Sequence, residues 1–143
     1  TLPYRGGVMN VLIIGAVSVA SLLVLLIVST RVMLLMKASK LKGKPASTVY
    51  QPSARRISSG KKTLLYFYTP SCGACRMQEP ILQKMSSKLG DVLFKIDATR
   101  APEAASAYGV LGVPFFVFIE KGTVVKASAG VQSEGNLSSF IDG

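Results

Sequence analysis

The chain has 143 residues, of which 49% are apolar, and a formal net charge of +10 at neutral pH. This length accommodates one small folded domain and one additional apolar segment. The chain has two cysteines and no histidine, which excludes histidine-based acid–base catalysis and leaves too few ligands for a four-ligand zinc site. We therefore expect neither a metal nor another cofactor.

The positive charge is confined to residues 1–62, which hold ten basic residues and no acidic residue. Residues 63–143 hold seven of each sign and are neutral overall. A basic block beside an apolar run suits the anionic headgroups of a bilayer, because surfaces that bind single-stranded nucleic acid interleave basic residues with stacking aromatics. The distribution predicts contact with a membrane and no binding to nucleic acid.

The N-terminal part contains an uncharged run of 23 residues, 8–30, and a helix of about 20 residues spans the hydrocarbon core of a bilayer. Arg31 interrupts the run, but residues 32–36 continue it, and an arginine near a helix end can reach the headgroups. We expect a transmembrane helix over 8–36 after a short tail, 1–7. A secretory signal peptide is the alternative, but its apolar stretch of about 7–15 residues would be shorter.

Small residues recur along this apolar run. Gly15, Ser18 and Ser21 are three positions apart, and Ala16 and Ala20 are four apart. One helix face could therefore pack closely on another membrane protein, although small residues are frequent in any transmembrane helix. Both interpretations stay open.

The next segment, 37–46, contains four lysines and Pro45 and is typical of a short basic linker. A folded domain is expected over 47–143. Its first elements are weakly marked: a short strand at 48–50 and a short helix at 52–59, ended by Ser59-Gly60.

Beyond Gly60 the hydrophobic pattern indicates the element order βαβαββα. Strands are expected where β-branched, aromatic and other apolar residues form short runs, and helices where longer periodic segments follow turn residues. The expected strands are 63–68, 92–97, 113–119 and 124–129, and the expected helices are 72–89, 101–108 and 134–141.

The two cysteines stand in the sequence Cys72-Gly73-Ala74-Cys75, directly after a predicted strand and at the start of a predicted helix. Unpaired N–H groups at a helix N-terminus stabilise a thiolate, so Cys72 is the expected nucleophile. Cys75, one turn later, can attack a mixed disulfide at Cys72 and is the expected resolving thiol. The alternative is that the two cysteines are an incidental pair or a fragment of a metal site, but the sequence offers no third or fourth ligand for such a site.

Two segments resemble the thioredoxin family, and the resemblance extends over about 47–143. TLLYFYTPSCGACRMQEPIL resembles the family's strand, redox motif and first helix, including Pro80 five residues after the second cysteine. YGVLGVPFFVFIEKGTVV resembles the family's cis-proline segment, strand and hairpin, so Val113-Pro114 is the candidate cis bond. Gly130 resembles the glycine that leaves room beside the redox pair.

The resemblance implies an α/β, thioredoxin-like fold, in which a central mixed sheet is flanked by helices, here preceded by one transmembrane helix. It also implies a thiol-disulfide oxidoreductase that works through Cys72 and Cys75 on protein disulfides. The substrate groove that it implies comprises Tyr68, Gly73, Ala74, Val113, Pro114 and Gly130.

The departures from the family concern proton transfer and the edges of the motif. Tyr66 replaces the family's buried aspartate, while the lysine that accompanies this aspartate persists as Lys95. Glu79 is a candidate substitute for the missing carboxylate. The tryptophans that flank the motif are replaced by Tyr68 and Ser71. These changes favour a dedicated thioredoxin-like protein over a general reductant.

The distribution of basic residues around the apolar run predicts the side of the membrane on which the folded domain lies. Eight basic residues lie in 37–62, against Arg5 before the apolar run, which favours a cytoplasmic domain, whereas tethered members of the family are more often extracytoplasmic. A cytoplasmic pair would be kept reduced and would donate electrons to a partner disulfide. The alternatives are an electron-relay, assembly or accessory subunit of a membrane complex, and a structural subunit with vestigial cysteines.

Overall fold

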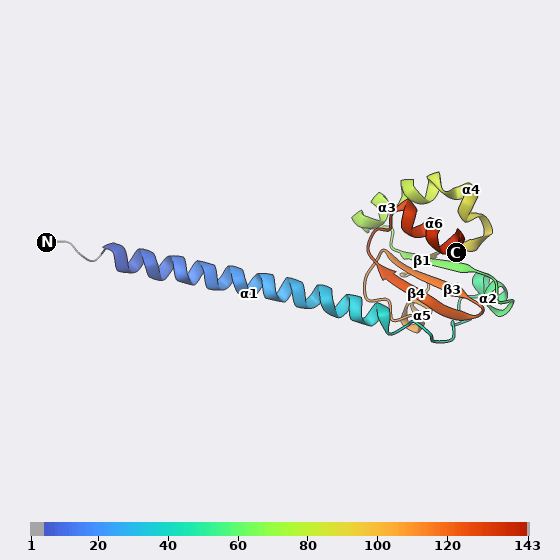
Figure 1. Cartoon of the computed structure of the whole chain (residues 1–143), viewed down its shortest axis with the longest axis horizontal. Coiled ribbons are helices and arrows are strands. Elements are labelled where there is room, and N and C mark those ends of the chain that lie inside the picture. The colour runs from blue at the N-terminus through green and yellow to red at the C-terminus, as the bar shows by residue number, and fades with distance from the viewer. Residues whose placement is uncertain (1–4, 143) are drawn as a thin grey trace. The chain divides into compact units, whose positions relative to one another are not determined.

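The computed structural model describes the backbone of residues 5–142 and the side chains of residues 7, 9–33 and 40–142 (Figure 1). The chain divides into two compact units, Thr1–Leu34 and Leu35–Gly143. Each is described by itself.

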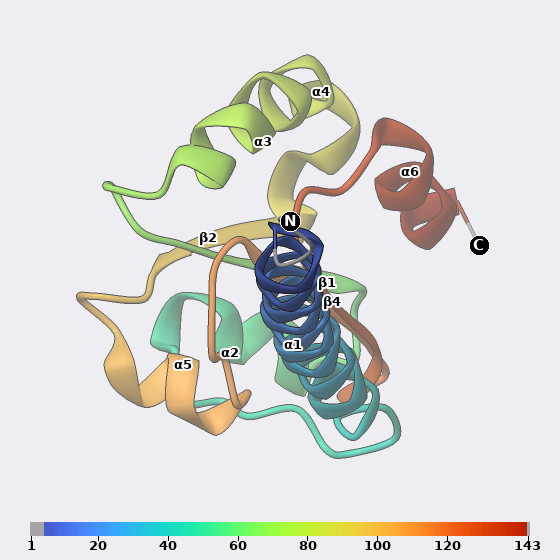
Figure 2. The same ribbon diagram turned by 90° about the vertical axis from the view of Figure 1, so that its left-hand side faces the viewer.

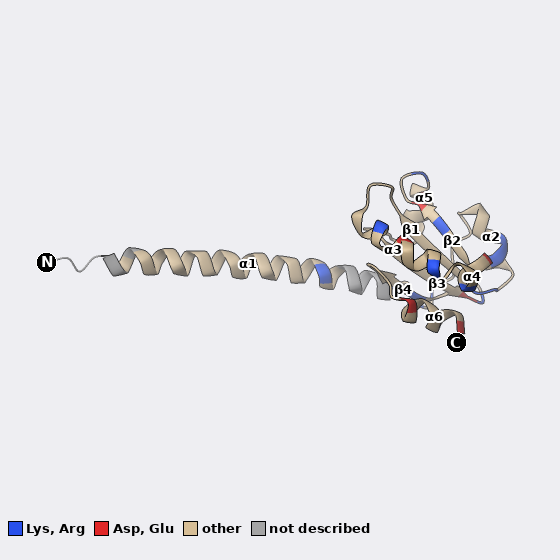
Figure 3. Ribbon diagram, turned by 90° about the horizontal axis from the view of Figure 1, so that it is seen from above, with Lys and Arg blue, Asp and Glu red and all other residues tan. Residues whose placement is uncertain are grey.

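The first unit is formed by the helix α1 (Arg5–Ser39), which continues into the second unit. Its segment Met9–Met33 is long and apolar enough to cross a membrane. The Ser18 hydroxyl donates to the Ile14 carbonyl at 2.8 Å, and the Thr30 hydroxyl donates to the Ile27 carbonyl at 2.8 Å. Such bonds satisfy hydroxyl groups without water, as a lipid environment requires. In Figure 3 the part of α1 that is not grey is coloured almost entirely tan, the colour of residues other than Lys, Arg, Asp and Glu.

The second unit is built on a four-stranded mixed sheet with the strand order β2-β1-β3-β4. β1 pairs in parallel with β2 and antiparallel with β3, and β3 pairs antiparallel with β4. The two central strands consist of TLLYFY and FFVFIE, and nearly every residue in them is buried, as expected for strands covered on both faces. The strands are β1 (Thr63–Tyr68), β2 (Leu93–Asp97), β3 (Phe115–Glu120) and β4 (Thr123–Ala129).

Helices cover both faces of this sheet (Figure 2). Leu65 and Phe67 of β1 point into one core cluster, and Leu64 and Tyr66 point into the other, following the two-residue alternation of a strand. The helices α2 (Gln51–Ser58) and α5 (Pro102–Ala107) pack on the first cluster. The helices α3 (Gly73–Lys84), α4 (Ser86–Leu89) and α6 (Glu134–Asp142) pack on the second cluster. The 3-10 helix η1 (Gly90–Val92) leads into β2. The predicted mixed sheet flanked by helices is confirmed.

Two predicted elements differ from the structure. Residues 48–50 do not form a strand. The helix expected over 72–89 is interrupted at Met85, which adopts a turn conformation before α4 begins at Ser86. The serines that follow Met85 favour a helix start over a helix interior, and Met85 and Leu89 are both buried in the same cluster.

Residues 43–46 belong to the segment expected to form a linker, but they are hydrogen-bonded to the domain. The Gly43 N–H donates to the Val124 carbonyl at 2.8 Å, the Val124 N–H donates to the Lys44 carbonyl at 2.9 Å, and the Ala46 N–H donates to the Gly122 carbonyl at 2.8 Å. These bonds cover the beginning of the free edge of β4, where an exposed strand would otherwise invite association with other chains. Residues 43–46 are therefore hydrogen-bonded to the domain.

Candidate active site

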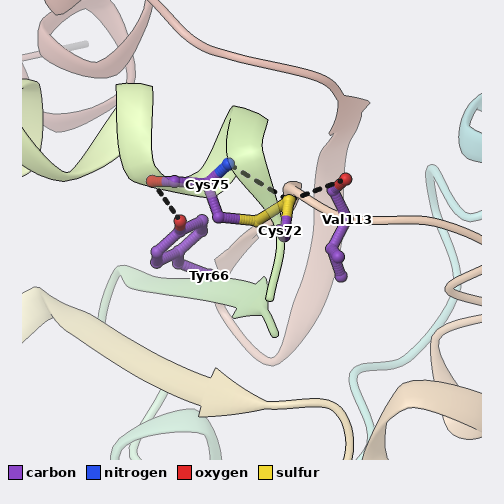
Figure 4. Close-up of a disulfide and its surroundings, with 4 residues drawn as sticks. All are labelled: Tyr66, Cys72, Cys75 and Val113. Atoms are coloured by element: carbon purple, nitrogen blue, oxygen red, sulfur yellow. Dashed lines mark hydrogen bonds between the residues drawn. A yellow bond between two sulfur atoms is a disulfide. The ribbon is translucent and has the colours of Figure 1, made fainter. Parts of the chain in front are cut away.

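The two cysteines lie at the N-terminal end of α3, just after the turn that follows β1. Cys72 is the residue that caps α3, and its sulfur accepts the Cys75 N–H at 3.1 Å. The two residues are joined as a disulfide, with a Cα–Cα distance of 5.2 Å (Figure 4). Cys72 is half-buried, whereas Cys75 is only 5% exposed. A partner can therefore reach Cys72, while Cys75 is enclosed by the chain.

One predicted groove residue, Val113, contacts Cys72, and two others, Pro114, which follows Val113 in the chain, and Gly130, are bonded to each other. The peptide bond between Val113 and Pro114 is cis, and the Val113 carbonyl oxygen lies 3.5 Å from the Cys72 sulfur (Figure 4). The Gly130 N–H donates to the Pro114 carbonyl at 2.8 Å. The residues just before β3 and just after β4 are thus bonded to each other, and the Val113 carbonyl lies against Cys72.

The structure gives a second reason for glycine at position 130, besides the expected one of leaving room beside the redox pair. A Cβ atom built on Gly130 would meet nothing within 4 Å, so the chain itself does not crowd this position. Its φ of 89° lies in the left-handed region, which residues with a side chain rarely adopt. The backbone conformation therefore requires the glycine.

Tyr66 lies beneath the pair and cannot take over the role of a carboxylate base. Its ring is buried and stacks on Phe116 at 4.8 Å between ring centroids, and its hydroxyl donates to the Cys75 carbonyl at 3.4 Å. Burial, and then the charge of Glu79 and the neighbouring Tyr68, raise the pKa of Tyr66 to about 12. The phenol is therefore neutral and serves as a donor at physiological pH.

Glu79 and Lys95 are brought to the same place. Glu79 follows Cys75 by one helical turn, and it lines a pocket of about 180 Å³ together with both cysteines and Tyr66. Lys95 is opposite Tyr66 in the pairing of β1 with β2, and it forms an ion pair with Glu79. Both charged groups are about half exposed, so the pair is in contact with solvent.

Of the other predicted groove residues, one lines this pocket and two lie between the cysteines in the chain. Tyr68 is half-buried and lines the pocket with Thr69 and Pro70. Gly73 and Ala74 form the first turn of α3, where Gly73 is exposed. No group of three or more potential metal-ligating side chains occurs in the part of the chain that the structure describes.

Sequence reasoning missed Gln78 and Gln132, which are buried and bonded to each other. One signal was present in the sequence. Cys75, Gln78 and Leu82 are spaced by three and four residues, which places Gln78 on the buried stripe of α3. A polar residue on such a stripe indicates a specific buried hydrogen bond.

The sequence model of the family described as Thioredoxin matches residues 47–143. The chain belongs to the thioredoxin family. It is 33% identical to the thioredoxin of Bacillus subtilis over 78 residues, which are 53% of this chain and 75% of that protein. It is 31% identical to thioredoxin H2 of Arabidopsis thaliana over 91 residues, which are 62% of this chain and 68% of that protein.

Solved structures of thioredoxins agree with this assignment. A mutant thioredoxin from Halobacterium salinarum is 36% identical and superposes with a TM-score of 0.53, covering 59% of this chain and 75% of that one. The thioredoxin of Fasciola hepatica is 29% identical, with a TM-score of 0.54, covering 62% of this chain and 84% of that one. The predicted thioredoxin-like fold is confirmed, and this thioredoxin-family chain is a thiol-disulfide oxidoreductase.

Proposed function

We propose that this chain is a membrane-tethered reductase of protein disulfides, held by α1 with its redox pair on the cytoplasmic side. One observation carries the proposal: the reachable Cys72 caps α3 beside the Val113 carbonyl, while Cys75 is enclosed behind it. The apolar segment Met9–Met33 supports the tether. The basic residues of 37–62 support the cytoplasmic orientation.

The proposed reaction begins with the reduced pair. The Cys72 thiolate attacks one sulfur of the partner disulfide, and the other partner sulfur leaves as a thiolate that takes up a proton. Cys75 then loses its proton and attacks the Cys72 sulfur, which releases the second partner thiol. The partner gains two electrons and two protons, and the pair becomes the disulfide seen in the structure.

The groove for an extended partner segment runs past Val113, Pro114 and Gly130. Two large apolar side chains close to these residues in the chain are exposed: Leu111 is 56% exposed and Val131 is 41% exposed. A pocket of about 460 Å³ on the Leu111 side is lined by apolar residues, including Val110 and Val113. We infer that the partner presents apolar side chains next to its disulfide.

Glu79 is proposed as the acceptor of the Cys75 proton, with Lys95 holding the carboxylate in place. Both Glu79 and Cys75 line the same pocket, which is large enough for water to pass the proton between them. Besides Glu79 and the two cysteines, the titratable or charged residues lining this pocket are Tyr66 and Tyr68 from β1 and Arg76 from α3.

Turnover of a peptide disulfide by the full chain in detergent, with dithiothreitol as electron donor, tests this function. The wild-type chain should reduce the peptide catalytically. Glu79→Gln should slow turnover about tenfold near neutral pH, because a half-exposed site lets solvent replace part of the usual contribution of a general base. The loss should shrink as the pH rises and hydroxide replaces the carboxylate.

The matched control is Glu134→Gln, which also breaks an exposed ion pair, here with Lys84. Glu134 does not line the pocket of the redox pair, so this variant should keep the wild-type rate and pH profile. Wild-type turnover with an unaffected Glu79→Gln variant would overturn the role of Glu79. Absence of wild-type turnover would overturn the proposed function itself.

A further inference from the structure

The buried side-chain amide of Gln78, on α3, is hydrogen-bonded to the loop between β4 and α6. Gln78 is 0% exposed, and both ends of its side chain bond to the backbone of a single residue. Its Nε2 donates to the Gln132 carbonyl at 3.2 Å, and its Oε1 accepts the Gln132 N–H at 2.6 Å. This arrangement satisfies a side-chain amide in the core, where an unbonded amide would be strongly destabilising.

The contact continues from Gln132 to the redox pair. The Gln132 side-chain Nε2 donates to the Gly130 carbonyl at 3.1 Å, and the Gly130 N–H donates to the Pro114 carbonyl at 2.8 Å. The Val113 carbonyl lies 3.5 Å from the Cys72 sulfur. A closed series of contacts therefore runs from α3 through Gln132, Gly130 and the cis-proline segment back to Cys72.

The segment that Gln78 holds has little other local support. Residues 130–133 connect β4 to α6 without regular secondary structure. An apolar side chain at position 78 would fill the core equally well, but it would deprive the Gln132 N–H and carbonyl of these partners. The location of Gly130 beside Pro114 thus depends in part on the amide of Gln78.

We propose that Gln78 is a positioning residue that fixes the Gly130 wall of the groove and thereby sets the affinity for an extended partner segment. The inference rests on the proposed function, because it assumes that the partner lies along Val113, Pro114 and Gly130. Gln78 does not touch either sulfur in the hydrogen bonds of the described residues. It therefore controls partner binding and leaves the chemistry of the sulfurs unchanged.

The test compares two disulfides with the full chain in detergent. One is a synthetic peptide with a disulfide in an extended segment, and the other is 2-hydroxyethyl disulfide, which is too small to span the groove. Gln78→Met should raise the KM for the peptide about tenfold with little change in kcat, since two hydrogen bonds that hold the wall are lost. Its rate with the small disulfide should equal the wild-type rate.

Gln83→Met is the matched control, because Gln83 is an exposed residue of the same helix. It should leave both substrates unaffected. A second variant, Gln132→Ala, removes the bond to the Gly130 carbonyl but keeps the backbone groups that Gln78 binds, and it should raise the peptide KM by a smaller factor. This variant provides the test if Gln78→Met does not fold.

Two results would overturn the proposal: an unchanged peptide KM in both the Gln78 and Gln132 variants, or an equal loss with both disulfides. The second result would mean that Gln78 acts on the redox motif. A wild-type chain that reduces the small disulfide but not the peptide would instead contradict the proposed function. This outcome differs from both of the results above.

Discussion

Replacing Cys72 with serine should lower turnover of a peptide disulfide by at least about three orders of magnitude, to the uncatalysed rate. Cys72 is the sulfur that a partner can reach, and a serine hydroxyl does not carry out thiol-disulfide exchange. Cys75→Ser should abolish turnover as well but leave the first attack intact. This variant should accumulate a mixed disulfide between Cys72 and the peptide, detected as an added mass in non-reducing mass spectrometry.

Ser71→Ala, next to the motif and exposed, is the control and should keep wild-type turnover. The opposite pattern would contradict the assigned roles. A mixed disulfide that forms at Cys75 in the Cys72→Ser variant, with none at Cys72 in the Cys75→Ser variant, would make Cys75 the nucleophile.

The domain should lose stability steeply as the pH rises from 10 toward 12. Burial raises the pKa of both Tyr66 and Tyr108 to about 12 in the folded state, against an ordinary value near 10 in the unfolded state. A raised folded-state pKa contributes stability that is complete below pH 10 and is lost through pH 12. Two pKa units correspond to about 2–3 kcal/mol for each tyrosine.

Urea denaturation of the oxidised full chain, measured in detergent at several pH values, checks this expectation. The double variant Tyr66→Phe, Tyr108→Phe should lose much less stability over this pH range than the wild-type chain. Near neutral pH it should differ modestly, because it lacks only the hydrogen bonds from Tyr66 to Cys75 and from Tyr108 to the Ser47 carbonyl. Equal alkaline losses in both proteins would show that the two phenols do not cause the effect.

The fold was largely predictable because its signals are local. The runs TLLYFY and FFVFIE consist of apolar and β-favouring residues, and both form central strands close to the expected bounds. The redox motif was also predictable, because a cysteine pair between a strand and a helix combines spacing with context. The resemblance to the thioredoxin family then indicated Val113, Pro114 and Gly130 as groove residues; in the structure the Val113 carbonyl lies against Cys72, and Gly130 is bonded to Pro114.

The features that sequence reasoning missed depend on contacts between distant residues. The bonds of Gln78 to Gln132 span 54 positions, and nothing local to α3 identifies the partner. The pairing of Gly43–Ala46 with β4 likewise depends on which strand is left at the sheet edge. A basic, proline-containing segment is typical of a linker until that edge is known.

The residues around Cys75 show how a departure from the family can be accommodated. With Tyr66 in place of an aspartate, the retained lysine would lack a carboxylate, and Glu79 supplies one from α3. A carboxylate therefore still lines the pocket of the redox pair, but it belongs to Glu79 of α3 and is about half exposed to solvent. This arrangement is the basis for proposing Glu79 as the proton acceptor.

The most direct test of a membrane-tethered reductase with a cytoplasmic redox pair is the labelling of its two cysteines by a membrane-impermeant maleimide after mild reduction. The chain contains only Cys72 and Cys75, so any label on it reports this pair. We predict labelling of Cys72 in permeabilised cells and none in intact cells. Labelling in intact cells would contradict the cytoplasmic orientation and place the redox pair outside the cytoplasm.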